Sequence, residues 1–253
     1  MYFNYLSSKI YYEKIGNSNK TLIILPGWGD NRKTFSSIIK KLKDKFTIYI
    51  FDYPGFGNSS IPNKDLTIYN YAEIIIAFMN KNKIENPHIM GHSFGGRIIL
   101  VMNGYYNIKF QKILLISSAG IKPKSKKKKN IKQRIYKLLK IIGKILPRKI
   151  NTIYQNMLIS IFGSNDYKSL TPELRKTFIN IVNEDLTKYL ENIDSNTLLI
   201  WGEDDIDTPI NDAIIMNKYI KNSALITIKK ATHFCYLEYS SYVISIILSF
   251  FEW

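Results

Sequence analysis

Short, nearly continuous apolar runs alternate along the chain with longer segments in which apolar residues recur every three or four positions. The short runs are typical of strands buried on both faces, and the periodic segments are typical of helices with one apolar face. The expected strands are residues 21–27, 46–52, 88–91, 112–118, 197–202 and 224–229. The expected helices are residues 31–43, 67–81, 94–105, 211–220 and a closing helix from about Glu238. This alternation predicts an α/β fold with a mostly parallel sheet flanked by helices.

Two parts of the chain depart from the alternation. Residues 1–15 carry alternating aromatic side chains and predict an antiparallel hairpin at one edge of the sheet. Residues 121–192 lie between two expected strands and have a mostly helical pattern, which includes an amphipathic helix from Asn130 to Pro147. We therefore expect a core formed by residues 1–120 and 193–253, with residues 121–192 inserted as a helical lid.

Length and composition agree with one such domain. The chain has 253 residues, and 45% of them are apolar, which is enough for a sizeable core and excludes wholesale disorder. Its one cysteine, Cys235, cannot form an intramolecular disulfide, and the first residues do not have the pattern of a signal peptide. We therefore expect a cytoplasmic protein. Residues 242–253 are too short and too polar to span a bilayer, so they predict a packed terminal helix.

Positive charge is concentrated in one segment. The formal net charge is +16, and residues 122–150 contain 13 Lys and Arg and no acidic residue. A solvated face in a lysine-rich chain would explain this charge, and peripheral contact with an anionic membrane is the alternative. Nucleic acid is disfavoured, because Tyr136 is the one aromatic residue interleaved with these bases.

A serine stands between an expected strand and an expected helix, in the pentapeptide Gly91-His92-Ser93-Phe94-Gly95. A nucleophilic serine at the top of a parallel sheet needs a tight turn, and glycines two residues to either side permit it. The helix start also brings amide N–H groups and the positive end of the helix dipole. A serine that caps the helix would have the same pattern, so the pentapeptide alone leaves both interpretations open.

A nucleophilic serine needs a base, and the chain has three histidines. His92 adjoins Ser93, so its side chain leaves the turn in another direction. His88 lies in the strand and fits a core histidine with satisfied hydrogen bonds. His233 follows the last strand and lies at the carboxyl end of the sheet, where ligands of open α/β sheets bind. Four acidic residues after the strand at 197–202 could orient it: Glu203, Asp204, Asp205 and Asp207.

Backbone N–H groups are needed where negative charge develops on the substrate. Phe94 follows the serine and offers one such group. The loop Gly27-Trp28-Gly29 offers a second at Trp28, although a plain turn would have the same glycines. We find no cluster of residues with metal-ligand spacing and no cofactor motif, and we interpret Cys235 as a packing residue.

Taken together, these segments resemble the α/β-hydrolase superfamily, in its branch of small, lidded, cofactor-free serine hydrolases. The resemblance covers residues 21–118 and 196–253. Its motifs are LPGWGDN, DYPGFGNS, GHSFGG, WGEDDIDTP and ATHFCYLE. The fourth motif places the acid at Asp205, and the chain order of serine, acid and histidine is the order of that family. Pro26 departs from the pattern, because the family usually has histidine before the glycine.

The resemblance implies a hydrolase with Ser93 as nucleophile, His233 as base, Asp205 as orienting acid, and the N–H groups of Trp28 and Phe94 as oxyanion hole. The expected substrate is a carboxylic ester, lactone or thioester with a small to medium, partly apolar acyl group, and no cofactor or metal is expected. A C–C bond hydrolase or lyase with the same triad is the alternative. An alternative of another class is a catalytically retired protein that binds membrane surfaces. Three residues of the insertion are expected to line the acyl pocket: Met157, Ile161 and Phe162.

Overall fold

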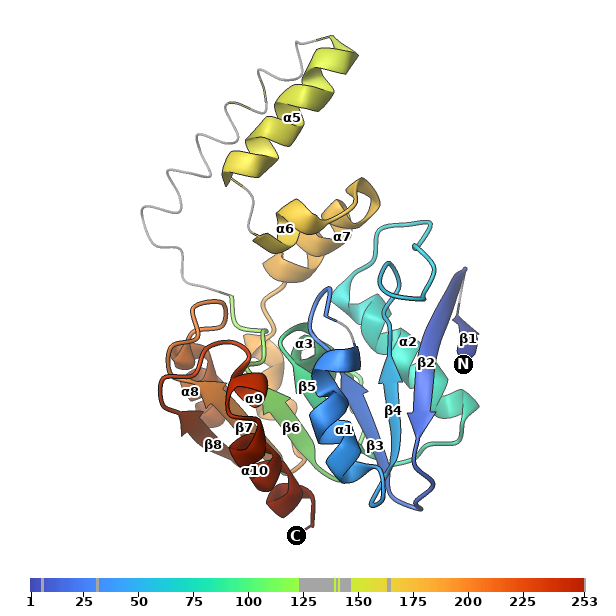
Figure 1. Cartoon of the computed structure of the whole chain (residues 1–253), viewed down its shortest axis with the longest axis vertical. Coiled ribbons are helices and arrows are strands. Elements are labelled where there is room, and N and C mark those ends of the chain that lie inside the picture. The colour runs from blue at the N-terminus through green and yellow to red at the C-terminus, as the bar shows by residue number, and fades with distance from the viewer. Residues whose placement is uncertain are drawn as a thin grey trace.

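An eight-stranded sheet forms the centre of the molecule (Figure 1). The computed structural model describes residues 1–5, 7–30, 32–122, 139, 141, 147–162 and 165–252. The strands are β1 (Tyr2–Tyr5), β2 (Ser8–Ile15), β3 (Thr21–Leu25), β4 (Thr47–Phe51), β5 (His88–His92), β6 (Ile113–Ile116), β7 (Thr197–Gly202) and β8 (Ser223–Ile228). Their order across the sheet is β1-β2-β4-β3-β5-β6-β7-β8. Strands β3 to β8 pair in parallel, while β2 pairs antiparallel with both β1 and β4, which confirms the mostly parallel sheet and its edge hairpin.

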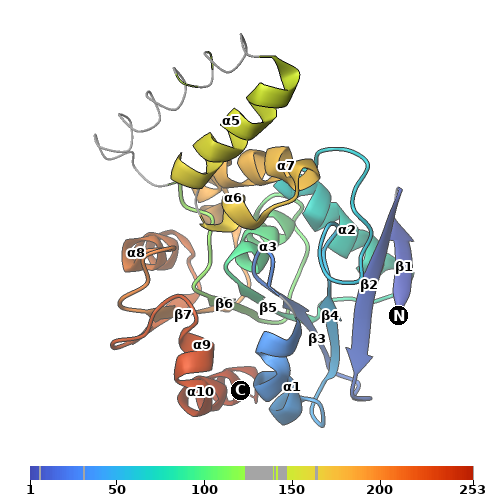
Figure 2. The same ribbon diagram turned by 45° about the horizontal axis from the view of Figure 1, so that its top comes forward.

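Helices cover both faces of the sheet, because the central strands are apolar on both sides. On β3, Ile23 and Leu25 join one buried cluster, while Leu22 and Ile24 join the other. The first cluster is covered by α2 (Ile68–Lys81), α3 (Phe94–Gly104) and α8 (Ile210–Tyr219). The second is covered by α1 (Ser36–Leu42), α9 (Cys235–Glu238) and α10 (Ser240–Glu252). The two layers of helices are separated by the sheet in Figure 2.

Most predicted elements end within one or two residues of the observed bounds, and two differences have a clear structural reason. The expected helix at residues 31–43 begins as a 3₁₀ turn, η1 (Arg32–Phe35), and becomes α-helical only at Ser36. Strand β6 is shorter than expected, because Ser117 has a φ of +42° and leaves the extended conformation. The start of α2 agrees with prediction, since Thr67 caps it by accepting a hydrogen bond from the backbone N–H of Asn70.

The insertion between β6 and β7 contains α5 (Arg148–Phe162), α6 (Asn165–Ser169) and α7 (Pro172–Asn183), and a 3₁₀ helix, η2 (Thr187–Asn192), leads back to the core. Helices α6 and α7 lie over the carboxyl ends of the parallel strands, and α5 projects away from them (Figures 1 and 2). Helix α7 is attached to the core where Thr177 Oγ1 accepts a hydrogen bond from the backbone N–H of Leu66. The helix expected from Asn130 to Pro147 lies largely outside the described residues.

The carboxyl-terminal segment packs as a helix against the core. Val243, Ile247 and Phe251 of α10 are buried against the face of the sheet that α1 also covers. This agrees with the prediction of a packed terminal helix. Among the described residues, no helix has the length and apolar character that crossing a bilayer requires.

Candidate active site

Ser93 occupies a strained turn between β5 and α3. Its φ of +50° and ψ of −109° lie in a region that residues with a side chain rarely adopt. The turn is held by backbone hydrogen bonds on both sides. The Ser93 N–H donates to the carbonyl of Ile116 at 3.1 Å, and the Ser93 carbonyl accepts from the N–H groups of Gly96 and Ala119. A strained serine fixed in this way is typical of a nucleophile elbow.

The glycines around Ser93 are required by close approach of the backbone. A Cβ atom on Gly95 would overlap the carbonyl oxygen of Leu25, because α3 packs directly on the end of β3. A Cβ atom on Gly91 would lie 2.7 Å from the backbone of Gly95 and Gly96. The tight turn predicted from the sequence therefore depends on the absence of side chains at these positions.

Asp205 and His233 meet in a buried pair beyond the ends of β7 and β8. Asp205 Oδ2 lies 2.9 Å from His233 Nδ1, and the two residues are only 4% and 9% exposed. The same Oδ2 accepts a hydrogen bond from Thr208 Oγ1 at 2.7 Å. Asp205 Oδ1 accepts hydrogen bonds from the backbone N–H groups of Asp207 and Thr208. Of the four acidic candidates only Asp205 is buried, which agrees with the choice that the family resemblance makes.

The charge of Asp205 fixes the tautomer of His233. Burial alone would raise the pKa of Asp205, but the hydrogen bonds from His233 and Thr208 outweigh it and hold that pKa below its usual value. An ionised carboxylate only accepts hydrogen bonds, so His233 Nδ1 must carry the proton. His233 Nε2 is then the basic nitrogen, as a general base requires.

His92 supports the loop that carries His233. Its Nε2 lies 3.0 Å from the backbone carbonyl of His233, and its Nδ1 lies 3.8 Å from Asp30 Oδ2. Burial lowers the pKa of His92, so the ring is neutral and Nε2 donates its proton to that carbonyl. The sequence analysis expected His92 to point away from the serine turn, but the sequence contained no signal for this supporting contact.

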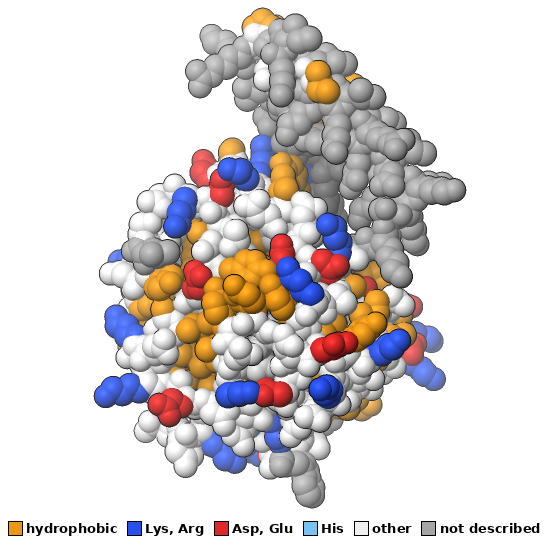
Figure 3. All heavy atoms as spheres, turned by 180° about the vertical axis from the view of Figure 1, so that it is seen from behind, with side chains coloured by type: hydrophobic (Ala, Val, Ile, Leu, Met, Phe, Trp, Pro, Cys, Tyr) orange, Lys and Arg blue, Asp and Glu red, His pale blue; other side chains and the backbone are white. Residues whose placement is uncertain are grey.

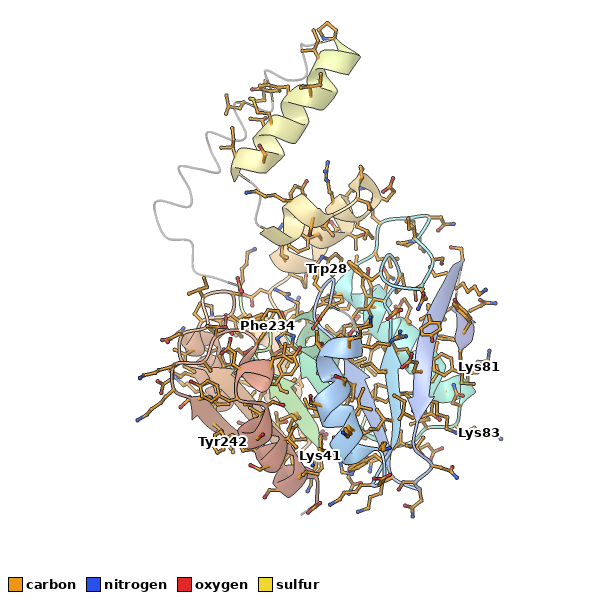
Figure 4. The ribbon with its side chains drawn as sticks, viewed as in Figure 1. Trp28, Lys41, Lys81, Lys83, Phe234 and Tyr242 are labelled. Carbon is orange, nitrogen blue, oxygen red and sulfur yellow. The ribbon has the colours of Figure 1, made fainter. Side chains whose placement is uncertain are left out.

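The two predicted oxyanion donors lie close together, Trp28 on the loop after β3 and Phe94 at the start of α3. Phe94 is the first residue of α3, where backbone N–H groups have no acceptor within the helix. The Trp28 ring contacts the Phe94 ring with centroids 5.0 Å apart, and it contacts Phe178 of α7 at 5.5 Å. Figure 4 shows Trp28 beneath α7, and Phe234, the neighbour of His233, at the start of α9. The Trp28 ring thus connects the start of α3 with α7.

A family model described as the alpha/beta hydrolase fold matches residues 20–185, well over half of the chain. The chain belongs to the α/β-hydrolase fold family. It is 25% identical to an uncharacterized hydrolase, YugF, of Bacillus subtilis strain 168, over 88% of this chain and 87% of that one. It is also 25% identical to a pimeloyl-[acyl-carrier protein] methyl ester esterase of Wigglesworthia glossinidia brevipalpis, over 96% and 97%. The fold is similar to that of MGS-M2, an α/β-hydrolase enzyme from a Medee basin deep-sea metagenome library, with a TM-score of 0.77 and 20% identity over 100% and 98%.

Arg97 of this α/β hydrolase joins the serine-bearing helix to the insertion. It is buried one turn after Ser93, and its Nη1 donates to the backbone carbonyl of Glu184, the residue that ends α7, at 2.9 Å. The charge of Arg97 also acts on Asp212 of α8, but burial together with the charge of Asp205 outweighs it and raises the pKa of Asp212 to about 6. The sequence analysis missed this network, although a lone arginine within the apolar run of α3 signals a buried partner.

Within the part of the chain that the structure describes, one group of side chains has metal-ligand geometry, although the sequence predicted no such cluster. Ligand atoms of Asp205, Asp207 and His233 lie within 4.8 Å of one another, because Asp207 shares a tight loop with the buried pair. Both oxygens of Asp205, however, already accept hydrogen bonds from His233, Thr208 and the loop backbone. The donor set therefore fits an acid that orients a histidine better than a carboxylate that ligates a cation.

Two other expectations were wrong. Met157 and Ile161 were expected to line an acyl pocket, but they are 47% and 60% exposed because α5 projects away from the sheet (Figure 1). The side chain of Phe162 lies outside the described residues. His88 is buried as expected, but its Nδ1 has no hydrogen-bond partner among the described residues.

Proposed function

We propose that this α/β hydrolase cleaves carboxylic esters through an acyl-enzyme formed on Ser93. The observation that carries the proposal is the buried contact of 2.9 Å between Asp205 Oδ2 and His233 Nδ1. This contact leaves Nε2 as a base, and the chain also has a strained serine at a strand-to-helix turn. A binding protein has no need for either feature.

Each group has a definite task in the proposed reaction. His233 Nε2 takes the proton of Ser93 as Oγ attacks the ester carbonyl, and the N–H groups of Phe94 and Trp28 stabilise the resulting oxyanion. His233 returns that proton to the departing alcohol, which leaves the acyl group on Ser93. Water then attacks the acyl-enzyme with His233 again as base, and the acid leaves as Ser93 regains its proton. Asp205 keeps its charge throughout and stabilises the imidazolium.

The surroundings of Ser93 support a partly apolar acyl group. The Trp28 ring lies among Phe56, Phe94 and Phe178, so aromatic side chains of the core and of α7 come together next to the oxyanion loops. In this proposal, α6 and α7 act as the lid. The relative named as a methyl ester esterase supports an ester rather than a carbon–carbon bond as the target.

Covalent labelling tests the nucleophile directly. A fluorophosphonate probe should label the wild-type protein and Ser36→Ala, which changes an exposed serine of α1, but not Ser93→Ala. Hydrolysis of p-nitrophenyl esters by Ser93→Ala should fall by at least about 10³-fold while the circular dichroism spectrum stays unchanged. Full activity in that variant overturns the proposal. Turnover of vinylogous diketones without ester turnover replaces it with carbon–carbon hydrolysis.

A further inference from the structure

Helix α5 presents an apolar stripe to solvent. Four large side chains recur at intervals of three or four residues along it and lie on one face, with exposed fractions of 53%, 73%, 47% and 60%: Ile150, Ile153, Met157 and Ile161. The flank of the helix next to these side chains is engaged, since Leu158 is buried and Tyr154 Oη donates to the carbonyl of Leu139. We call the four exposed residues the α5 stripe.

The α5 stripe lies on the part of the molecule that reaches furthest from the sheet. Helix α5 extends beyond α6 and α7 in Figure 1, and Figure 3 shows hydrophobic side chains at the surface of this projecting part. A projecting helix can touch a flat surface without interference from the globular core. An apolar stripe in such a place is a contact surface rather than scattered exposure.

The charge of the adjoining sequence indicates which kind of partner the α5 stripe can bind. Residues 122–150, which run into the start of α5, contain 13 Lys and Arg and no acid, and α5 itself contains no acid. A partner must therefore be both apolar and anionic. A second copy of this chain would bring two such basic segments together, which their mutual repulsion opposes.

We propose that α5 anchors the protein to an anionic lipid bilayer. The helix lies in the plane of the membrane with the α5 stripe among the upper acyl chains, and the positive charge of the adjoining sequence favours an anionic bilayer over a neutral one. This inference goes beyond the proposed function, because it needs neither Ser93 nor an ester. It adds that the site beneath α7 is held close to a lipid surface.

Vesicle flotation of the full chain tests the anchor. The protein should float with equimolar phosphatidylcholine and phosphatidylglycerol but not with phosphatidylcholine alone. Added salt screens the attraction between lysines and lipid phosphates. It should weaken binding by about fivefold for each lysine that it screens. A variant with Ile153→Glu and Met157→Glu should lose at least about tenfold in partitioning, because charge replaces two inserted apolar groups. Ile214→Glu, at a side chain of α8 that is 53% exposed, should bind like wild type.

A label provides a second readout that introduces no charge. Cys235 is buried, so an environment-sensitive dye would react selectively with a new thiol at Ile153→Cys or at the control Ile214→Cys. Anionic vesicles should increase the dye emission at position 153 and not at position 214. Equal binding to neutral and anionic vesicles, an unchanged dye at position 153, or a dimer that the double variant dissociates would each overturn the anchor.

Discussion

Thr208 holds Asp205 through both oxygens of the carboxylate. Its Oγ1 donates to Oδ2 at 2.7 Å, the same oxygen that faces His233, and its backbone N–H donates to Oδ1 at 2.9 Å. Thr208 is itself fixed, because the indole Nε1 of the buried Trp201 donates to its carbonyl at 2.7 Å. The orientation of the acid is thus set by a residue that does not touch His233's basic nitrogen.

Replacing Thr208 with valine tests whether the Thr208 hydroxyl stabilises the charged carboxylate of Asp205. The hydrogen bond from Oγ1 helps to keep the pKa of Asp205 low, so Thr208→Val should raise that pKa and destabilise the protein by about 1–2 kcal/mol at pH 7. A low folded pKa stabilises above the unfolded value of about 3.9 and loses this effect as the pH falls through the folded pKa. The loss of unfolding free energy in Thr208→Val should therefore be smaller below pH 4 than at pH 7, as measured by urea unfolding under both conditions.

Thr208→Ser is the matched control, because it keeps the hydroxyl and removes only the methyl group. It should unfold within about 0.5 kcal/mol of wild type at pH 7. An equal loss in both variants would mean that the methyl group, and not the hydrogen bond to Asp205, supports the loop.

Gly95→Ala should destabilise the protein although alanine is the better helix former. Alanine normally stabilises a helix position by about 1 kcal/mol relative to glycine. Here its Cβ would overlap the carbonyl of Leu25, so α3 must shift away from β3 at a cost of about 3 kcal/mol. The shift also moves the backbone of Phe94. Urea unfolding measures the cost, and an unchanged or higher midpoint would contradict the close packing of α3 on β3.

Most of the fold could be predicted, because the strands are continuous apolar runs that need no tertiary information. Strand β7 begins and ends where the pattern predicts, since apolar residues stop at Gly202. Strand β6 ends early because the turn at Ser117, whose carbonyl oxygen lies 3.1 Å from Thr208 Oγ1, overrides its local preference. Such a contact across 91 residues leaves no mark in the local sequence.

The site was predicted where a motif has a fixed spacing and missed where contacts depend on the fold. The tight turn at Ser93 follows from the glycines around it, while the choice of Asp205 among four acids came from the resemblance of its loop to that of the family. His92 and Arg97 act on parts of the chain far from them, at His233 and Glu184, so periodicity alone does not reveal their partners. The projection of α5 was missed because its pattern fits a buried stripe as well as an exposed one.

His88 should make the protein sensitive to mild acid. Burial, with the charges of Lys112 and Lys20, lowers its pKa from 6.5 to about 4. Between these values the unfolded chain binds a proton that the folded protein does not, so stability falls as the pH drops through this window. The loss should be about 1–2 kcal/mol, below the roughly 3 kcal/mol of the full shift, because the ring lines an open groove.

Unfolding midpoints of wild type and His88→Gln at pH 7 and pH 4 test this sensitivity. The variant cannot titrate, so its stability should fall less between the two values. Lys20→Gln removes one neighbouring charge and should give an intermediate slope, because the pKa of His88 then rises. Parallel curves for all three proteins would show that other groups control the acid response.

Asp212 should make the protein less stable as the pH rises, because its carboxyl group has a raised pKa in the folded state. Burial and the charge of Asp205 raise its pKa from 3.8 to about 6, although Arg97 opposes this shift. Between these values the folded protein keeps a proton that the unfolded chain has lost, so stability falls as the pH rises through the window. Asp212→Asn removes this penalty and should stabilise the protein at pH 7 by about 1 kcal/mol, after allowance for solvent screening. At pH 4, where the folded Asp212 is neutral, the gain should be nearly absent.

Asp204→Asn, at an exposed acid on the loop of Asp205, is the control and should show no such difference between pH 7 and pH 4. A gain of equal size at both pH values would mean that the amide improves packing, and that repulsion from Asp205 does not strain the site.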